Sequence, residues 1–297
     1  MFDSDEFIDF IVVAAPRSGT TWLAEALGEH PQIWIPPAKE LNFFNDIFLD
    51  HREFNYSRGI DFYKKQFQKA PSNLLLGELT PTYYADPGAV QRIHQHFQKV
   101  KIIAILRNPA EVVFSTYLKT LEYGITKNTF ELAIKKNSDY IKLGYYHRLL
   151  KPYFDLFPNN HIRIIIYEEF FSDLEQQYKD LCRFLDVDDN FLPTVFHQRI
   201  NPRRIVRWKF LVKFRHYLRL IINYPHLLPL KRLITRGGFL NDLSELIIKL
   251  NLKEGSTPKL DPTTKKKLLD IYESDIVKLE NMLNINLDVW KTEKPDH

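Results

Sequence analysis

Short apolar runs alternate along the chain with longer segments in which apolar residues recur at helical spacing. Continuous runs rich in β-branched residues are typical of parallel strands covered on both faces, whereas spacing of three and four residues predicts amphipathic helices. A repeated strand-then-helix order predicts an α/β fold of three layers, with a central parallel sheet covered by helices on both faces. The runs that we interpret as strands are residues 10–15, 74–78, 101–106 and 162–167.

The segments with helical spacing are separated by prolines and polar turns, which terminate helices. After the first strand, Leu23, Ala26 and Leu27 give the next segment one apolar face. The last predicted helix follows a polar loop at residues 253–258 and packs the C-terminus, including Trp290, back on the sheet. The predicted helices cover residues 20–29, 59–69, 87–97, a segment opened by Pro109, 141–157, 174–185 and 262–283.

Composition indicates one soluble domain. A chain of 297 residues is long enough to bury a substantial core. Its single Cys182 excludes an internal disulfide and fits a buried apolar position in a reducing compartment. The acidic start at residues 1–6 is unlike a signal peptide, and no apolar run approaches the roughly 18 residues of a membrane span. We therefore expect one domain over residues 1–297 and a protein that is cytoplasmic or peripherally bound to a membrane.

Positive charge is concentrated in a basic, mainly helical segment at about residues 197–250. Eleven of the 41 Lys and Arg residues lie between residues 191 and 241, where there is no Asp or Glu, although the net charge of the chain is only +4. Aromatic and aliphatic residues alternate with these charges. The pattern fits contact with an acidic ligand, a membrane surface or nucleic acid, and it equally fits a solvated helical face.

Residues 15–22 form a tight polar loop that leads into the first predicted helix. Unpaired N–H groups and the positive end of the helix dipole favour an anion such as phosphate or sulfate at such a point, and Arg17 adds a full charge. The alternative is a simple strand-to-helix turn capped by Ser18 or Thr20.

Three other groups of polar residues are candidates for a site. Glu40 lies between two prolines and two phenylalanines, where it is either a surface residue or a carboxylate held beside the anion loop. Glu78 and Thr80 end the second strand, at the edge where parallel sheets bind ligands, although Glu78 also fits a loop-orienting role. Arg107 ends the third strand, and Ser115 follows eight residues later on a helix. These two residues either flank one ligand or have separate structural roles.

These motifs together resemble those of sulfotransferases that depend on 3′-phosphoadenosine 5′-phosphosulfate (PAPS). Residues 16–22, Pro-Arg-Ser-Gly-Thr-Thr-Trp, resemble the 5′-phosphosulfate loop of that family, and Arg107 with Ser115 matches its 3′-phosphate pair in residue type and spacing. Three segments resemble the heparan sulfate sulfotransferases in particular, and the 253–258 loop and residues 288–290 fit their C-terminal pattern. The three segments are residues 39–44, 59–63 and 77–83.

The resemblance implies a P-loop-type fold and in-line transfer of a sulfuryl group from PAPS to a hydroxyl or amine, leaving adenosine 3′,5′-bisphosphate (PAP). It implies that Glu40 is the general base and that Arg17 stabilises charge on the phosphosulfate oxygens. A saccharide or glycolipid acceptor is implied, with no metal and no nucleic acid. The implied cofactor-binding residues are Arg17, Ser18, Gly19, Thr20, Thr21, Trp22, Arg107, Ser115, Lys253 and Gly255, and the implied acceptor-binding residues are Lys39, Glu78, Thr80 and Tyr83.

Two departures from the family pattern bear on mechanism and specificity. Many relatives have Lys where Arg17 stands, although tyrosylprotein sulfotransferases are similar in having Pro-Arg-Ser-Gly-Thr-Thr; arginine is a poor proton donor. Leu79 replaces a Lys that contacts the acceptor site in heparan-type enzymes. A tyrosine or phenol sulfotransferase is therefore an alternative, as is a noncatalytic protein that binds a membrane surface or an acidic polysaccharide. A P-loop kinase is discounted, because no Lys follows the loop glycine.

Overall fold

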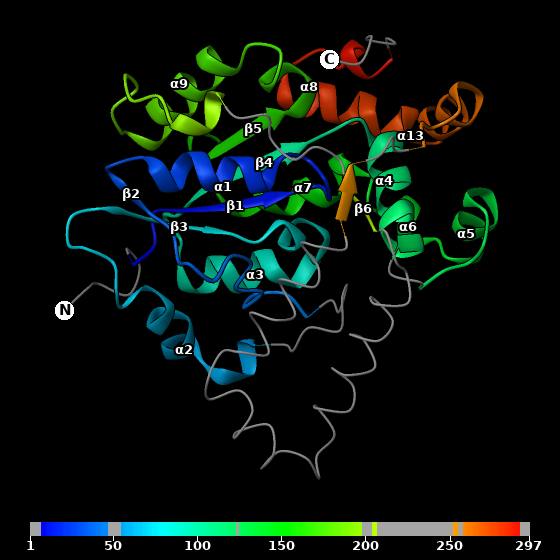
Figure 1. Cartoon of the computed structure of the whole chain (residues 1–297). Helices are drawn as coiled ribbons and strands as arrows, with labels where there is room; N and C mark the ends of the chain where they lie inside the picture. The colour runs from blue at the N-terminus through cyan, green and yellow to red at the C-terminus, as the bar shows by residue number, and fades with distance from the viewer. Residues whose placement is uncertain are drawn as a thin grey trace. The chain divides into compact units, whose positions relative to one another are not determined.

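The computed structural model describes residues 7–46, 55–122, 125–197, 204–206, 252–254 and 258–291 (Figure 1). The chain divides into two compact units. Unit 1 consists of residues 1–115, 138–198 and 261–297, and unit 2 of residues 116–137 and 199–260. The expectation of a single domain with a basic segment stays a prediction, since residues 207–250 lie outside the described residues.

Unit 1 is built on a five-stranded parallel sheet, which confirms the predicted α/β class. The central strand β1 is fully buried and pairs with β3 on one side and β4 on the other, as expected for a continuous apolar run. The two-residue edge strand β2 was not predicted, because two residues carry no periodic signal. In spatial order the strands are β2 (Ile33–Trp34), β3 (Leu75–Leu79), β1 (Phe10–Ala14), β4 (Lys101–Leu106) and β5 (Ile162–Ile166).

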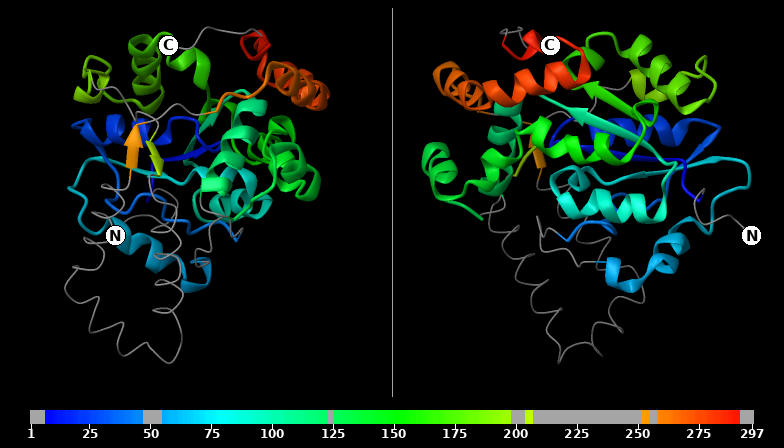
Figure 2. Two further views of the ribbon diagram at one scale, coloured as in Figure 1. Left: turned by 45° about the vertical axis from the view of Figure 1, so that its right-hand side comes forward. Right: turned by 180° about the vertical axis from the view of Figure 1, so that it is seen from behind.

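Helices cover both faces of this sheet, as the alternating pattern predicted. Helix α1 (Thr20–Glu29) lies on one face, and α3 (Pro87–His96) and α7 (Tyr146–Leu156) lie on the other (Figures 1 and 2). On the first face, α9 (Leu174–Leu185) packs on α1, where the Tyr178 hydroxyl donates to the Ala26 carbonyl oxygen over 3.2 Å. On the second face, α13 (Pro262–Leu283) packs along α7.

The ends of these helices follow local capping signals. Helix α3 begins where the Asp86 carboxylate accepts from the Gly88 N–H over 2.8 Å, and α13 begins where Asp261 accepts from the Thr264 N–H over 2.9 Å. In both helices proline occupies a position in the first turn. The bounds of α13 and α9 agree with the predicted ranges, because their apolar periodicity is uninterrupted.

Two predicted helices are divided in the structure. The range 59–69 contains α2 (Ile60–Lys64) and a separate 3-10 turn. The range 141–157 is interrupted at Gly144, where a Cβ atom would lie 2.5 Å from the ring of Tyr272. The other helices are α4 (Pro109–Glu122), α6 (Asp139–Lys142) and α8 (Tyr167–Phe170), and the 3-10 turns are Tyr56–Arg58, Lys65–Phe67, Pro81–Ala85, Asn159–His161, Thr194–His197 and Asp288–Trp290.

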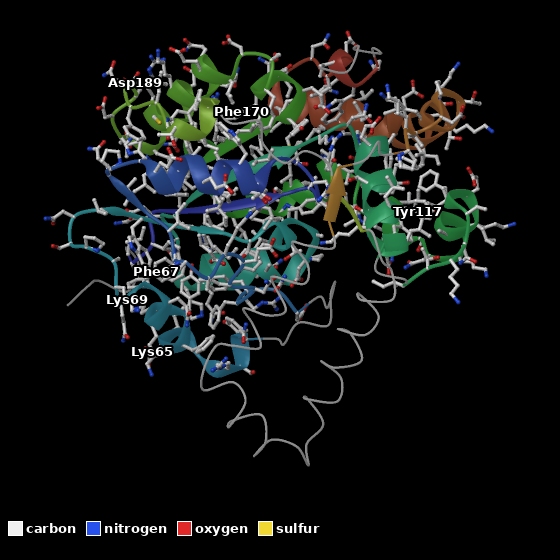
Figure 3. The ribbon with its side chains drawn as sticks, in the orientation of Figure 1. Lys65, Phe67, Lys69, Tyr117, Phe170 and Asp189 are labelled. Atoms are coloured by element: carbon white, nitrogen blue, oxygen red, sulfur yellow. The ribbon has the colours of Figure 1, made fainter. Side chains whose placement is uncertain are left out.

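Unit 2 contains α5 (Phe130–Lys136) and an antiparallel pair of strands, β6 (Arg204–Val206) and β7 (Leu252–Glu254). The ring of Tyr117, labelled in Figure 3, packs 5.2 Å from that of Phe130. Lys253 was expected in a polar loop and lies instead in β7, because the pairing partner β6 is some 50 residues away and invisible to local pattern. Gly255 lies outside the described residues.

Cys182 is fully buried in α9, and this burial raises the pKa of its thiol to about 11.

Among the helices that the structure describes, none has the length and apolar character needed to cross a membrane.

Candidate functional site

The turn between β1 and α1 is tight and has an unusual backbone. Arg17 and Gly19 both have positive φ angles, 64° and 78°, in the region that favours glycine. At Gly19 a Cβ atom would lie 2.8 Å from the ring of Phe171 and 3.3 Å from that of Tyr167. The close approach of α8 and the residue after it therefore requires glycine in this loop.

The start of α1 and the Ser18 hydroxyl both lack side-chain hydrogen-bond partners among the described residues. Helix α1 has no side-chain cap and no acidic residue in its first turn, so the capped-turn alternative does not describe it. The Ser18 side chain is 0% exposed, and among the described residues its hydroxyl has no hydrogen-bond partner. A buried hydroxyl of this kind costs free energy unless something satisfies it. The turn therefore fits an anion that accepts hydrogen bonds from the start of α1.

Arg107, at the end of β4, reaches this turn directly. Its Nη1 atom donates to the carbonyl oxygen of Arg17 over 3.0 Å. Its guanidinium also lies 4.8 Å from the centre of the Tyr167 ring, and Glu111 is 4.0 Å away on α4. Residues that are 90 positions apart in the sequence are thus adjacent, and two candidate anion-binding groups belong to one site.

A buried polar cluster holds the chain at Arg107. The Glu168 carboxylate accepts from the Asn108 backbone N–H over 2.8 Å and from the Trp290 indole N–H over 2.9 Å. The Asn108 side chain donates to the Trp290 carbonyl oxygen over 2.7 Å, and the Tyr146 hydroxyl donates to the Arg107 carbonyl oxygen over 2.7 Å. Burial raises the pKa of Glu168. This cluster was not predicted, because its members come from four separate elements.

Ser115 lies on α4, two turns beyond Arg107, and is half-buried. Among the described residues no hydrogen bond joins it to Arg107, so a shared ligand for this pair stays a prediction. The indole of Trp22 is fully buried among aromatic rings, 5.7 Å from the ring of Phe170, which is labelled in Figure 3. The Trp22 ring therefore packs inside unit 1, and a contact between its backbone N–H group and a cofactor stays a prediction.

The segment that carries Glu40 runs beside the start of α1. The Lys39 ammonium donates to the Thr21 hydroxyl oxygen over 3.2 Å. Glu40 is half-buried with a φ angle of 64°, and Asn42 also has a positive φ angle of 48°. The Asn42 side-chain amide stabilises this conformation by donating to the Glu40 carbonyl oxygen over 2.8 Å. The contact between Lys39 and Thr21 places this segment at the first turn of α1, and the role of Glu40 as a general base stays a prediction.

Glu78, the penultimate residue of β3, is the centre of a buried hydrogen-bond network. Its carboxylate accepts from the hydroxyls of Tyr63 over 2.7 Å, Thr80 over 2.6 Å and Tyr83 over 2.7 Å. Tyr63 also packs on Phe67, which is labelled in Figure 3, with 5.3 Å between ring centres. Burial raises the pKa of Glu78 and raises the pKa of both tyrosines well above the usual range.

The same network holds the Glu40 segment in place. The Thr80 hydroxyl oxygen accepts from the Asn42 backbone N–H over 3.3 Å. The Tyr83 hydroxyl oxygen accepts from the backbone N–H groups of Phe43 over 2.9 Å and Phe44 over 3.3 Å. Each hydroxyl donates to Glu78 and accepts from the segment, so Glu78 is connected to the Glu40 segment through two relays.

Three of the predicted acceptor-binding residues are buried in this network, and their contact with an acceptor stays a prediction. Glu78, Thr80 and Tyr83 are at most 1% exposed, and their polar atoms point toward one another and toward the segment backbone. Of the predicted acceptor-binding residues, Lys39 alone is partly exposed. Within the described ranges no group of three or more His, Cys, Asp and Glu side chains is placed to hold a metal ion.

The chain is similar in sequence to known sulfotransferases. The profile of the sulfotransferase domain family matches residues 7–201. A membrane-associated sulfotransferase of Dictyostelium discoideum, kil1, is 32% identical over 144 residues, which are 45% of this chain and 29% of that protein. The human heparan sulfate glucosamine 3-O-sulfotransferase 5 is 26% identical over 167 residues, 52% of this chain and 46% of that protein.

Among solved structures, a sulfotransferase from Alicyclobacillus acidocaldarius aligns with a TM-score of 0.69. That alignment covers 96% of this chain and 99% of the other, at 22% identity, and it shows a common fold. The aligned part of the chain spans less than half the length of each of these two curated relatives.

Proposed function

We propose, on the premise that this chain belongs to the sulfotransferase family, that it transfers a sulfuryl group from PAPS to an acceptor hydroxyl or amine. The observation that carries the proposal is the Arg107–Arg17 hydrogen bond of 3.0 Å, which joins the two candidate anion-binding groups. PAPS carries anionic groups at the 5′ and 3′ positions of one ribose, and a site with two linked anion-binding groups suits such a ligand.

The turn after β1 fits the 5′ end of this donor. The buried Ser18 hydroxyl lacks a partner among the described residues, and Gly19 has the positive φ angle of 78° with which the turn enters α1. Arg107 and Ser115 are assigned to the 3′-phosphate. Lys253 and Gly255, assigned to the cofactor by resemblance, stay predictions, because Gly255 lies outside the described residues and Lys253 belongs to unit 2.

Bound PAPS supplies an activated sulfuryl group with PAP as its leaving group. In the proposed reaction the acceptor oxygen or nitrogen forms a bond to sulfur while the bond between sulfur and the bridging oxygen breaks, and the electron pair of that bond stays on the 5′-phosphate of PAP. Glu40 accepts the proton that the acceptor loses. Arg17 stabilises the negative charge that grows on the bridging oxygen without giving up its own proton.

Glu78, Thr80 and Tyr83 have a positioning role in this proposal. The Thr80 and Tyr83 hydroxyls hold the backbone of residues 42–44 through hydrogen bonds of 2.9–3.3 Å, and both hydroxyls donate to Glu78. This backbone begins two positions after the base Glu40. A general base must lie within hydrogen-bond reach of the proton that it removes, so a rigid segment favours catalysis.

A carbohydrate or glycolipid is the proposed acceptor class. The support is the similarity to proteins named as heparan sulfate glucosamine 3-O-sulfotransferases, together with the Lys39-Glu40 and Phe43-Phe44 motif. Heparan-type enzymes commonly have Lys at the position of Leu79. We therefore do not propose heparan sulfate itself as the substrate.

The test is transfer of labelled sulfate from PAPS to a panel of saccharides, glycolipids, phenols and tyrosine peptides, run beside calorimetric titration with PAP. The proposal expects PAP binding and labelling of a saccharide or glycolipid. Binding of acidic polysaccharide or anionic vesicles without PAP binding would instead favour a noncatalytic protein, and labelling confined to phenols or tyrosine would overturn the acceptor class.

A further inference from the structure

The Lys39 ammonium lies at the first turn of α1, where the helix dipole disfavours a positive charge. It donates to the Thr21 hydroxyl oxygen over 3.2 Å, and its own backbone N–H donates to the Pro37 carbonyl oxygen over 3.0 Å. A helix N-terminus carries partial positive charge, and cations are disfavoured there. The side chain is nevertheless held at this end of the helix and is only partly exposed.

Burial outweighs the effect of nearby carboxylates on the Lys39 ammonium. Two carboxylates act on it, Glu40 in its own segment and Glu25 on α1, and both favour its charged form. Burial has the larger effect and lowers the pKa of Lys39. In the same turn the Ser18 hydroxyl is buried without a partner among the described residues, and α1 has no acidic residue in its first turn. An anion bound at this turn would offset both the helix dipole and the lysine charge.

We propose that Lys39 is a second cation of the donor site, with its ammonium directed to the 5′-phosphosulfate of PAPS rather than to the acceptor. This inference rests on the proposed function and deepens it. As the bond between sulfur and the bridging oxygen breaks, the ammonium donates a hydrogen bond to the oxygen that keeps the electron pair, and Lys39 retains its proton throughout. The acceptor proton still goes to Glu40, so the protons balance.

Lys39 and Arg17 then have different tasks. The Arg17 guanidinium is planar and spreads its charge over two or more oxygens, whereas an ammonium is a compact point charge. The hydrogen bond to Thr21 places this point charge on the helix whose N–H groups face the proposed anion. Because Lys39 and Glu40 are adjacent in the chain, one segment would supply both the base and the leaving-group cation.

The alternative is that Lys39 only ties its segment to α1 through Thr21. Nucleotide binding distinguishes the two roles. PAP carries phosphates at both the 5′ and 3′ positions, and adenosine 3′-phosphate lacks the 5′-phosphate. For Lys39→Met we expect the affinity for PAP to fall about tenfold or more, as for loss of a hydrogen bond between charged groups, with a less than about twofold change for adenosine 3′-phosphate.

The matched control is Lys151→Met, which removes an exposed lysine paired with Asp155 on α7. It should leave both affinities unchanged. Equal losses for the two nucleotides in Lys39→Met would overturn the proposal and show a structural tie. A wild-type protein that binds neither nucleotide would instead contradict the proposed function, so the two failures are distinguishable.

The pH profile of kcat gives a second measurement. If the Lys39 ammonium stabilises the leaving group, wild-type kcat should fall on the alkaline side, where the lysine loses its proton at a lower pH than an ordinary lysine. The Lys39→Met variant has no ammonium to titrate, so its residual kcat should lack that alkaline fall. An alkaline fall that is the same in wild type and variant would exclude Lys39 as its source and overturn the catalytic part of the proposal.

Discussion

The guanidinium of Arg107 donates a hydrogen bond of 3.0 Å to the carbonyl oxygen of Arg17. This contact joins the end of β4 to the turn after β1, so the residue assigned to the 3′-phosphate of the donor also supports the backbone that faces the 5′ end. The two binding regions are therefore physically coupled. A change at Arg107 should act on both, and most strongly on the 3′-phosphate.

The Arg107→Ala variant should lose selectivity for the 3′-phosphate. We expect its affinity for PAP to fall about tenfold to a hundredfold, because a charged hydrogen-bond donor to phosphate is removed. The affinity for adenosine 5′-phosphate, which has no 3′-phosphate, should fall much less. Calorimetric titration with both nucleotides measures this, with Arg183→Ala on the exposed side of α9 as the control. Equal losses would argue against recognition of the 3′-phosphate.

The Glu40→Gln variant should bind PAP with nearly wild-type affinity but transfer sulfate at least about a hundredfold more slowly. Glutamine has the same shape as glutamate and cannot accept the acceptor proton, so the chemical step is lost while donor binding is kept. Single-turnover transfer of labelled sulfate measures the loss. The control is Glu175→Gln, at an exposed ion pair on α9. Turnover close to wild type in Glu40→Gln would sink the base assignment.

The Glu78→Gln variant should slow transfer while binding PAP like wild type, because the network that holds residues 42–44 loses a charged acceptor for three hydroxyls. We expect a destabilisation of about 1–3 kcal/mol, typical of a disturbed buried hydrogen-bond network. A larger loss in kcat than in acceptor KM indicates misplacement of Glu40. If only acceptor KM changes, Glu78 contacts the acceptor, as the family resemblance implied.

The Glu78→Gln variant should also differ from wild type in how its free energy of unfolding depends on pH. Burial raises the pKa of Glu78 in the folded protein above its unfolded value, so the folded state binds a proton more readily. The stability that Glu78 contributes is thus complete below the unfolded pKa and declines as pH rises through the folded pKa. The difference in unfolding free energy between wild type and Glu78→Gln should therefore shrink with rising pH. Urea denaturation from about pH 4 to about pH 8 measures it, and a widening difference would contradict the prediction.

Two glycines near α1 provide a matched pair of substitutions. Gly19→Ala should reduce PAP affinity and destabilise the protein by more than about 1 kcal/mol, since φ is 78° and the new Cβ atom would meet Phe171 at 2.8 Å. At Gly28, within α1, no atom lies within 4 Å of a Cβ position. Gly28→Ala should therefore stabilise the protein by up to about 1 kcal/mol. Thermal unfolding with and without PAP compares them, and similar effects of both changes would refute the steric explanation.

The Trp290→Phe variant should destabilise unit 1 by about 1–3 kcal/mol, because one buried oxygen of Glu168 loses its indole donor at 2.9 Å while most of the ring packing is kept. A double-mutant cycle with Glu168→Gln should show a coupling free energy, since the two side chains are in direct contact. Strictly additive effects of the two changes would show that packing, not this hydrogen bond, explains the loss.

Sequence patterns predicted the regular elements most reliably where the signal is local. Strands β1 and β4 contain continuous apolar runs, and α13 has uninterrupted helical spacing with a proline at its start, so their bounds follow from neighbouring residues alone. Strands β3 and β5 are apolar runs interrupted by Glu78 and Arg163, and they were still predicted from their remaining apolar residues. The packing of Tyr272 against Gly144 was not visible, because the two residues are some 130 positions apart. The pairing of β7 with β6 was hidden for the same reason.

By itself the sequence determined the sulfotransferase family and predicted an anion-binding turn at residues 16–22, because both rest on contiguous residue types. Only the tertiary structure decided what the separate motifs do to one another. It placed the Arg107 guanidinium on the Arg17 carbonyl oxygen, the Glu78 carboxylate in a buried network with Tyr63, and the Lys39 ammonium on Thr21 of α1. Such contacts join residues 15 to 90 positions apart, and their geometry depends on how the whole core packs.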